Sequence, residues 1–324
     1  MSMNLNGFEA LEDRVLLAGN VTASLNTVTG ALTITGDAAA NSVAIVDTDN
    51  HGFYEIETAD GTNLTVVVDG VATDLGLDAN TGDTPVAVTS VVVNLGKGND
   101  VFAVVDSGFD GDLNNPALNV TINAGDGNDF VLIAGANFTD LGNVSIDGGK
   151  GNDIIVVDGI GANALAIGGG AGNDQVGVFN TFANTISLSL GAGNDQAGVD
   201  NVGANSLSIS GAGGNDQIGI SNAGFDSLSI DGGAGSDIVG LDTVGVNRTS
   251  IKMDGGKDLV EILNSDFFVS FDLKGGAKAD GVQIGGSNFF GVNTLKGGGG
   301  KDVLLNLGGN FFSAATTIKS FKLV

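Results

Sequence analysis

The sequence has 324 residues, of which 42% are hydrophobic, and its mean hydropathy is +0.25, which excludes an intrinsically disordered chain. Its formal net charge of −26 argues against a nucleic-acid-binding protein, because such proteins neutralise phosphates with lysine and arginine. There is no cysteine, which excludes disulfides and thiolate metal sites. Of the 38 acidic and 12 basic residues, 241–324 hold 8 and 9, which leaves 30 and 3 in 1–240. This polarity favours head-to-tail self-association.

The N-terminal segment, residues 1–19, lacks the basic region and apolar run of a conventional secretory signal. Within it, "FEALEDRVLLAG" (Phe8 to Gly19) resembles the LEPR-type motif at the start of large repeat-bearing bacterial surface and exported proteins, with Asp13 where that motif has proline. The resemblance implies a sorting element. The alternative is a short amphipathic helix that docks as a cap, with Leu11 and Val15 on one face, and one segment can serve both purposes.

Residues 20–95 are expected to form a β-rich N-terminal cap or the irregular first coils of the domain that follows. Their β-rich stretches are separated by tight turns predicted at Thr29-Gly30, Asp60-Gly61 and Asp69-Gly70. A cap is needed because the open end of a stack of strands exposes unpaired backbone groups.

Residues 96–324 contain a repeat that is marked by an aspartate after a turn of small residues. The intervals between these aspartates are 29 and 24 residues, then 21 five times, then 22 twice. The aspartates are Asp100, Asp129, Asp153, Asp174, Asp195, Asp216, Asp237, Asp258, Asp280 and Asp302. A fixed period of this kind is typical of a solenoid, in which each unit buries its apolar face only by stacking on its neighbours.

Two short strands are predicted in each repeat. Apolar residues stand two and four positions after the aspartate, as at Ile155 and Val157, and again twelve and fourteen positions after it, as at Leu165 and Ile167. Between the strands lies a second turn with an asparagine or aspartate, at Asn163, Asn184, Asn205, Asp226 and Asn247. The sequence therefore predicts an all-β fold, a right-handed parallel β-helix or β-roll solenoid with about 21 residues per coil.

The last coils contain Phe-Phe pairs at a period of about 22 residues. The pairs are Phe267 with Phe268, Phe289 with Phe290, and Phe311 with Phe312. They predict an aromatic ladder on or inside one wall of the solenoid. Filling of a wider core is the favoured explanation, and a binding patch for a partner is the alternative.

Four segments match the pattern G-G-x-G-x-D-x-U-x, in which U is a large apolar residue. They are "GGKGNDIIV" (148–156), "GGAGNDQVG" (169–177), "GGAGSDIVG" (232–240) and "GGGGKDVLL" (297–305). This pattern resembles the calcium-binding nonapeptide of the repeats-in-toxin (RTX) family of secreted bacterial proteins. The resemblance implies calcium held between coils by aspartate carboxylates and glycine carbonyls. The predicted metal residues are Asp100, Asp129, Asp153, Asp174, Asp195, Asp216 and Asp237.

Calcium also has a physical basis, because a dication between layers would neutralise aspartates that otherwise repel each other. The alternative is that each aspartate only accepts hydrogen bonds from amides of its own turn, at a solvated corner. The chain carries one such motif per coil, whereas RTX proteins usually carry it in tandem. From Asp258 onward, lysines enter the turns, at Lys257, Lys274, Lys278, Lys296 and Lys301. We expect these ammonium groups to replace the metal as counter-charge, so that the ions end near Asp237.

These features predict a non-enzymatic, extracellular or cell-surface protein: a calcium-stabilised structural subunit of a bacterial surface layer, matrix or self-assembling filament. No membrane insertion and no nucleic-acid partner are expected. One alternative is a calcium-dependent adhesin that binds a surface ligand or glycan. A polysaccharide-lyase-type β-helix enzyme ranks last, because it needs basic and acidic residues clustered in one groove, and basic residues are almost absent from the main repeat. His51 is the only histidine, which excludes a histidine cluster.

Overall fold

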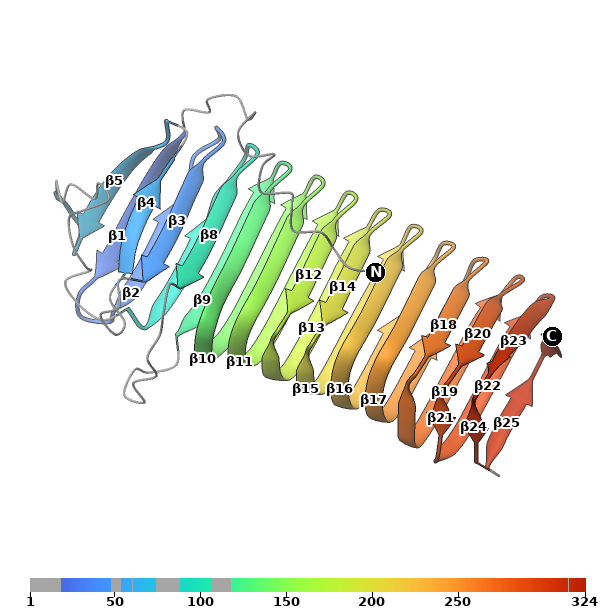
Figure 1. Cartoon of the computed structure of the whole chain (residues 1–324). Helices are drawn as coiled ribbons and strands as arrows, with labels where there is room; N and C mark the ends of the chain where they lie inside the picture. Colours follow the sequence, from blue (N-terminus) through green and yellow to red (C-terminus); the bar gives the residue numbers. More distant parts are fainter. Residues whose placement is uncertain (1–18, 48–53, 60, 74–87, 107–117, 314) are drawn as a thin grey trace.

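In the computed structural model, the chain winds into an all-β parallel solenoid (Figure 1). The structure describes residues 19–47, 54–59, 61–73, 88–106, 118–313 and 315–324. The LEPR-like segment, apart from Gly19, and His51 lie outside these residues. Among the described residues, no helix is long and apolar enough to cross a membrane.

Each coil contributes one strand to each of two parallel-stranded walls. The first wall begins just after each repeat aspartate and contains β3 (Ser42–Asp47), β8 (Val101–Asp106), the first parts of β10 (Phe130–Lys150) and β11 (Ile154–Ala171), β12 (Gln175–Phe179), β14 (Gln196–Asp200), the first parts of β16 (Gln217–Asp231) and β17 (Ile238–Lys252), β18 (Leu259–Leu263), β20 (Gly281–Gly285), β23 (Asp302–Gly308) and β26 (Phe321–Leu323).

The second wall is formed by the other half of each coil. It contains β2 (Ala31–Thr35), β7 (Ser90–Asn94), β9 (Asn119–Asp126), the second parts of β10, β11, β16 and β17, β13 (Phe182–Ala192), β15 (Gly203–Gly213), β19 (Asp266–Ala277), β22 (Val292–Gly299) and β25 (Thr316–Lys319). The short strands β21 (Asn288–Phe289) and β24 (Phe311–Phe312) extend its edge.

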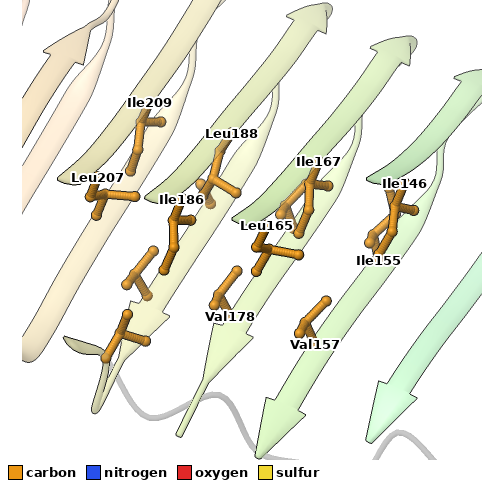
Figure 2. Packing of buried hydrophobic residues seen from close by; sticks show 14 of the residues in the cluster. Ile146, Ile155, Val157, Leu165, Ile167, Val178, Ile186, Leu188, Leu207 and Ile209 are labelled. Carbon is orange, nitrogen blue, oxygen red and sulfur yellow. The ribbon is translucent and has the colours of Figure 1, made fainter. Parts of the chain in front are cut away.

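The core lies between the two walls, and its side chains repeat from coil to coil. Ile155 pairs in register with Val176, and Leu165 pairs with Ile186. Figure 2 shows these apolar rows between the strands, for example Leu165, Ile186 and Leu207. Because a parallel ladder fixes the register, every buried side chain rests on its equivalent in the neighbouring coils, as the period-two pattern predicts.

The N-terminal strands are continuous with the solenoid. β2 and β3 pair in parallel with β7 and β8 of the next coil, while β1 (Asn20–Asn26) and β4 (Tyr54–Thr58) run antiparallel along β2 and β3. β5 (Asn63–Val68) lies parallel to β1 and forms a hairpin with β6 (Val71–Thr73). The predicted turn at Asp69-Gly70 joins these strands, and both residues have positive φ, 49° and 80°. These antiparallel additions cover the edge of the first coil.

The phenylalanine pairs of the last coils form two ladders, one inside and one outside. Phe267 and Phe289 are fully buried and stack with ring centroids 5.0 Å apart, and Phe289 stacks on Phe312 at 4.9 Å. Their neighbours Phe268 and Phe290 are each 48% exposed. The predicted ladder is therefore confirmed, and it is found both inside and on the wall.

Candidate metal column

Glycine predominates in the turn that precedes each aspartate, although Ala212, Asp254 and Lys278 hold equivalent left-handed positions in three coils. Gly149 and Gly151 have φ of 99° and 121°, in the left-handed half of the map that favours glycine. A Cβ on Gly151 would overlap the carbonyl oxygen of Gly127 one coil earlier, and a Cβ on Gly193 would overlap that of Gly172. Glycine therefore lets successive turns stack closely enough for the strands on either side to remain paired.

The ten repeat aspartates form a continuous buried column, which we call the aspartate column. Their exposed fractions lie between 0% and 4%, so they are not at a solvated corner. From Asp129 onward, the Oδ1 atom of each accepts a hydrogen bond from the backbone amide of the aspartate one coil earlier, as from Asp129 to Asp153 and from Asp153 to Asp174, both at 2.8 Å. Asp100 Oδ1 accepts from the amide of Asn41 in the same way. The nine bonds between coils measure 2.7–3.1 Å. The bonds thus link neighbouring coils, whereas the alternative interpretation had them within one turn.

The second carboxylate oxygen of every aspartate in the column, Oδ2, is buried and has no hydrogen-bond partner. In six coils it lies against a glycine five residues earlier, whereas the other four coils carry Leu95, Ala124, Leu190 and Met253 at that position. At Gly148, a Cβ would be 2.6 Å from Asp153 Oδ2 and 2.6 Å from the carbonyl oxygen of Gly169 in the next coil. Four coils, at Gly148, Gly169, Gly211 and Gly275, therefore bring a free carboxylate oxygen and a backbone carbonyl oxygen to the same point beside a glycine.

Burial makes these carboxylates hard to ionise. Desolvation raises the pKa of six members to about 6, and neighbouring aspartates add a smaller rise. The amide hydrogen bond to Oδ1 lowers the pKa, but by less than desolvation raises it. These six members are Asp100, Asp129, Asp153, Asp174, Asp216 and Asp258. Desolvation also raises the pKa of Asp195, Asp237 and Asp280. At neutral pH the column therefore stores unfavourable negative charge, which a proton or a cation would relieve.

A second ladder of hydrogen bonds, made by asparagines, runs beside the aspartate column, and its bonds point in the opposite direction along the rod. The amide of Asn152 donates to Oδ1 of Asn128 one coil earlier, and the amide of Asn173 donates to Oδ1 of Asn152, both at 2.7 Å. In each Gly-Asn-Asp triplet, the asparagine side chain therefore binds the following coil and the aspartate side chain binds the preceding coil. The asparagine of the triplet does not have positive φ, and the left-handed residues of these turns are mostly glycines.

The far corner of each coil carries two further amide ladders. The predicted one is confirmed: Nδ2 of Asn184 donates to Oδ1 of Asn163 at 3.0 Å, and the ladder continues through Asn205. The other was missed. Asn180 and Asn201, with φ of 47° and 55°, are joined by an Nδ2 to Oδ1 bond of 2.8 Å. Their signal in the sequence is an asparagine six residues after the repeat aspartate, where a left-handed corner favours asparagine.

The aspartate column matches calcium in its donor chemistry. Calcium takes carboxylate and backbone carbonyl oxygens, and both kinds converge beside Gly148, Gly169, Gly211 and Gly275, where the carboxylate oxygen lacks a partner. Among the described residues, no three acidic or histidine side chains converge, so backbone carbonyls would supply most ligands. All seven predicted metal residues belong to the column. Asp258, Asp280 and Asp302 occupy the same position and also have an unpartnered Oδ2.

Among the described residues, no lysine of the last coils forms an ion pair with the aspartate column, although the charge of Lys278 opposes the rise in the pKa of Asp258. The expectation that lysines replace the metal as counter-charge in the last coils therefore stays a prediction. Lys274 pairs with the surface residue Asp272 at 3.0 Å, and Lys252 pairs with Asp254 and with Asp231. The Oδ2 atoms of the column stay unpartnered through the last coils, so nothing in these contacts ends the column at Asp237.

Comparison of the chain with protein-family models, with curated proteins and with solved structures finds no match. The description of this protein therefore rests on its own geometry: a β-solenoid with coils about 21 residues apart and a stacked column of buried aspartates.

Proposed function

We propose that this protein is an extracellular structural rod, stabilised by calcium along the aspartate column, and that it is a self-associating subunit of a surface layer, matrix or filament. The observation that carries the proposal is the free, buried carboxylate oxygen that recurs in every coil of the column. A hard dication bound there would turn a row of repelling carboxylates into a clamp between coils.

The energetic case for calcium rests on the cost of leaving this column empty at neutral pH. Ten buried carboxylates lie one coil apart, and the raised pKa values of members such as Asp129 and Asp153 express desolvation first and repulsion from neighbouring aspartates second. Because the column exists only when the coils are stacked, the free energy of ion binding would add directly to the free energy of folding.

The structural role is supported by the ladders that cross every coil boundary. Parallel backbone pairing, the aspartate column and the amide ladders all act along the rod axis, so bending the rod strains all of them together. Stiffness along one axis, with side chains that can vary on the outer faces, suits a building element of a layer or filament.

The test compares the full-length protein in EGTA and in millimolar calcium, with circular dichroism for folding, calorimetry for ion binding and negative-stain microscopy for assembly. We expect calcium to raise the midpoint of thermal unfolding and to promote rods or filaments. The column variant D174N/D195N should bind less calcium, whereas the control D147N/D226N, which removes the same charge from exposed aspartates, should bind as the wild type. Equal behaviour of all three proteins in EGTA and in calcium would contradict the metal role.

A further inference from the structure

The last coils expose a row of apolar side chains, which we call the apolar strip: Phe268, Val269, Phe290, Val292 and Phe311. Their exposed fractions lie between 46% and 65%. Phe268 and Phe290 stack with ring centroids 5.8 Å apart, and Phe290 is 5.6 Å from Phe311. The rings therefore form one continuous surface across three coils, of the kind that marks an interaction site when it is not covered.

The apolar strip is not needed to fill the core. Phe267 and Phe289 already close the interior at this corner. The pairing of β17 with β19 shifts register after Val246, and this shift accommodates one extra residue, so that Phe268 and Val269 both point outward. An added residue that places two apolar side chains in water has a stability cost, unless the surface is covered in the assembled state.

A row of lysines lies on the same wall, and we call it the basic column: Lys252, Lys274, Lys296 and Lys319. They are in register on successive coils. In β22, Val292 and Lys296 point outward on the same face, four residues apart, which corresponds to about 13 Å. In the preceding coils, the basic column's position is held by Ser189, Ser210 and Asp231. Apolar and cationic side chains are thus added together, in the same coils and on the same wall.

We propose that the apolar strip and the basic column form one docking surface, and that its occupant is the acidic first wall of a second copy of this chain. This inference rests on the self-association in the proposed function and identifies its interface. If the C-terminal surfaces of two copies met, the lysines of one would face and repel the lysines of the other. Residues 1–240, in contrast, carry 30 acidic and 3 basic residues and would attract the lysines. Charge complementarity therefore favours contact between unlike parts of two copies.

The first wall of the acidic coils has a matching arrangement. Asp158, Asp200 and Asp242 occupy every second coil of one register column on the outer face, with Phe179 and Ser221 between them. Ile154 and Ile238 precede two of them by four residues on the same face, the same spacing as between Val292 and Lys296. When two copies meet through these two different surfaces, one copy keeps a free acidic first wall and the other keeps a free docking surface. Further copies can therefore add at both ends, and association continues into a filament unless the geometry closes a ring.

Sedimentation velocity of the full-length protein in calcium at low ionic strength tests the apolar half of the interface. The variant F268T/F290T/F311T keeps the buried phenylalanines, and F182T is the matched control, because Phe182 is 66% exposed on an earlier coil. We expect the triple variant to associate at least about tenfold more weakly, with unchanged circular dichroism and calcium binding, and F182T to associate as the wild type. Association of the triple variant at wild-type strength would overturn this interface but leave the proposed self-association intact.

Charge variants test the basic column, the other half of the proposed interface. K296Q/K319Q should weaken association and reduce its sensitivity to salt, whereas K97Q/K150Q removes two lysines from the acidic coils and should not weaken it. If the wild type stays monomeric in every condition, both the proposed self-association and this interface fail. If it is monomeric but binds anionic phospholipid vesicles through the same phenylalanines, the surface serves a membrane and the second-copy assignment is overturned.

Discussion

The coils between Asp153 and Asp258 repeat every 21 residues, whereas those between Asp258 and Asp302 repeat every 22. The interior continues across this change. The amide of Asp258 still donates to Asp280, and that of Asp280 to Asp302, at 3.1 and 3.0 Å. The outer surface changes: the register position held by Ser210 in the earlier coils is held by Lys274 and Lys296 in the last coils, where exposed phenylalanines also appear.

This comparison separates what the fold requires from what a partner would require. Stacking of coils fixes the turn glycines, the aspartate column and the inward apolar rows, and the inward position stays apolar in both regions. One added residue at the far corner is absorbed by a register shift between Val246 and Arg248. Variation on the outer faces therefore carries little cost to folding, and the surface of the last coils is free to serve another purpose.

The strongest test of the shared interior is a Cβ at a stacked turn. Gly193 has φ of 147°, and a Cβ there would overlap the carbonyl oxygen of Gly172. We expect Gly193→Ala to reduce the free energy of unfolding by about 5 kcal/mol or more, because the coils must separate. Gly213→Ala, next to the equivalent turn glycine Gly214 and with open space at its Cβ, is the control and should change the free energy of unfolding by less than about 1 kcal/mol. Urea unfolding followed by circular dichroism distinguishes the two.

The two phenylalanine ladders allow a comparison within one coil. Phe289 is fully buried between Phe267 and Phe312, so Phe289→Ala should cost about 3–5 kcal/mol through the cavity it leaves. Phe290 is 48% exposed, so Phe290→Ala should cost about 1 kcal/mol or less. Chemical denaturation of the two variants gives both values. Equal losses would mean that the outer ring supports the fold and would weaken the argument that it is there for a partner.

Much of this architecture was predictable because its determinants recur in every coil. The aspartate period and the apolar alternation, as at Ile155 and Val157, are local properties of the chain, and they predict stacked parallel strands with the aspartates in one line. The ladder through Asn163 and Asn184 followed from the same period.

The features that were not predictable depend on contacts between coils. The hydrogen-bond partner of Asp153 is the amide of Asp129, 24 residues earlier, which becomes known only when the register between coils is fixed. Likewise, adjacent phenylalanines such as Phe267 and Phe268 point to opposite faces of a strand, but which of them faces inward is set by the register with the preceding coil. Ion pairs of lysine with Asp231 and Asp272 are also between or along strands at the surface, which the turn motif does not reveal.

The pH dependence of stability tests whether the aspartate column is costly when ionised. The nine members from Asp100 to Asp280 have a raised pKa, about 6 for Asp153 and Asp174 against an ordinary value of 3.8, so the folded state binds protons more tightly than the unfolded state. The contribution to stability is then greatest below about pH 4 and is lost as the pH rises through about 6. In EGTA, we expect the thermal midpoint to rise when the pH falls from 7 to 5. A falling midpoint would contradict this, and calcium should reduce the pH effect by occupying the same oxygens.

The smallest expected effect concerns Lys278, which stands two residues before a repeat aspartate, at the turn position that other coils fill with glycine. Lys278 has φ of 94°, and the equivalent position one coil later is Gly300, with φ of 142°. A residue with a side chain is strained by about 1–2 kcal/mol in this conformation, and replacement by glycine would relieve that strain. Part of this gain in stability would be lost, because glycine has greater conformational freedom in the unfolded chain. We therefore expect Lys278→Gly to stabilise the protein by about 0.5–1 kcal/mol. Lys301→Gly removes the same charge from a residue whose φ is not positive, so it should destabilise by about 0.5–1 kcal/mol. In urea unfolding, changes of opposite sign in the free energy of unfolding would show that the left-handed turn position also favours glycine in the 22-residue coils. Changes of the same sign would mean that charge, and not backbone strain, governs these two turns.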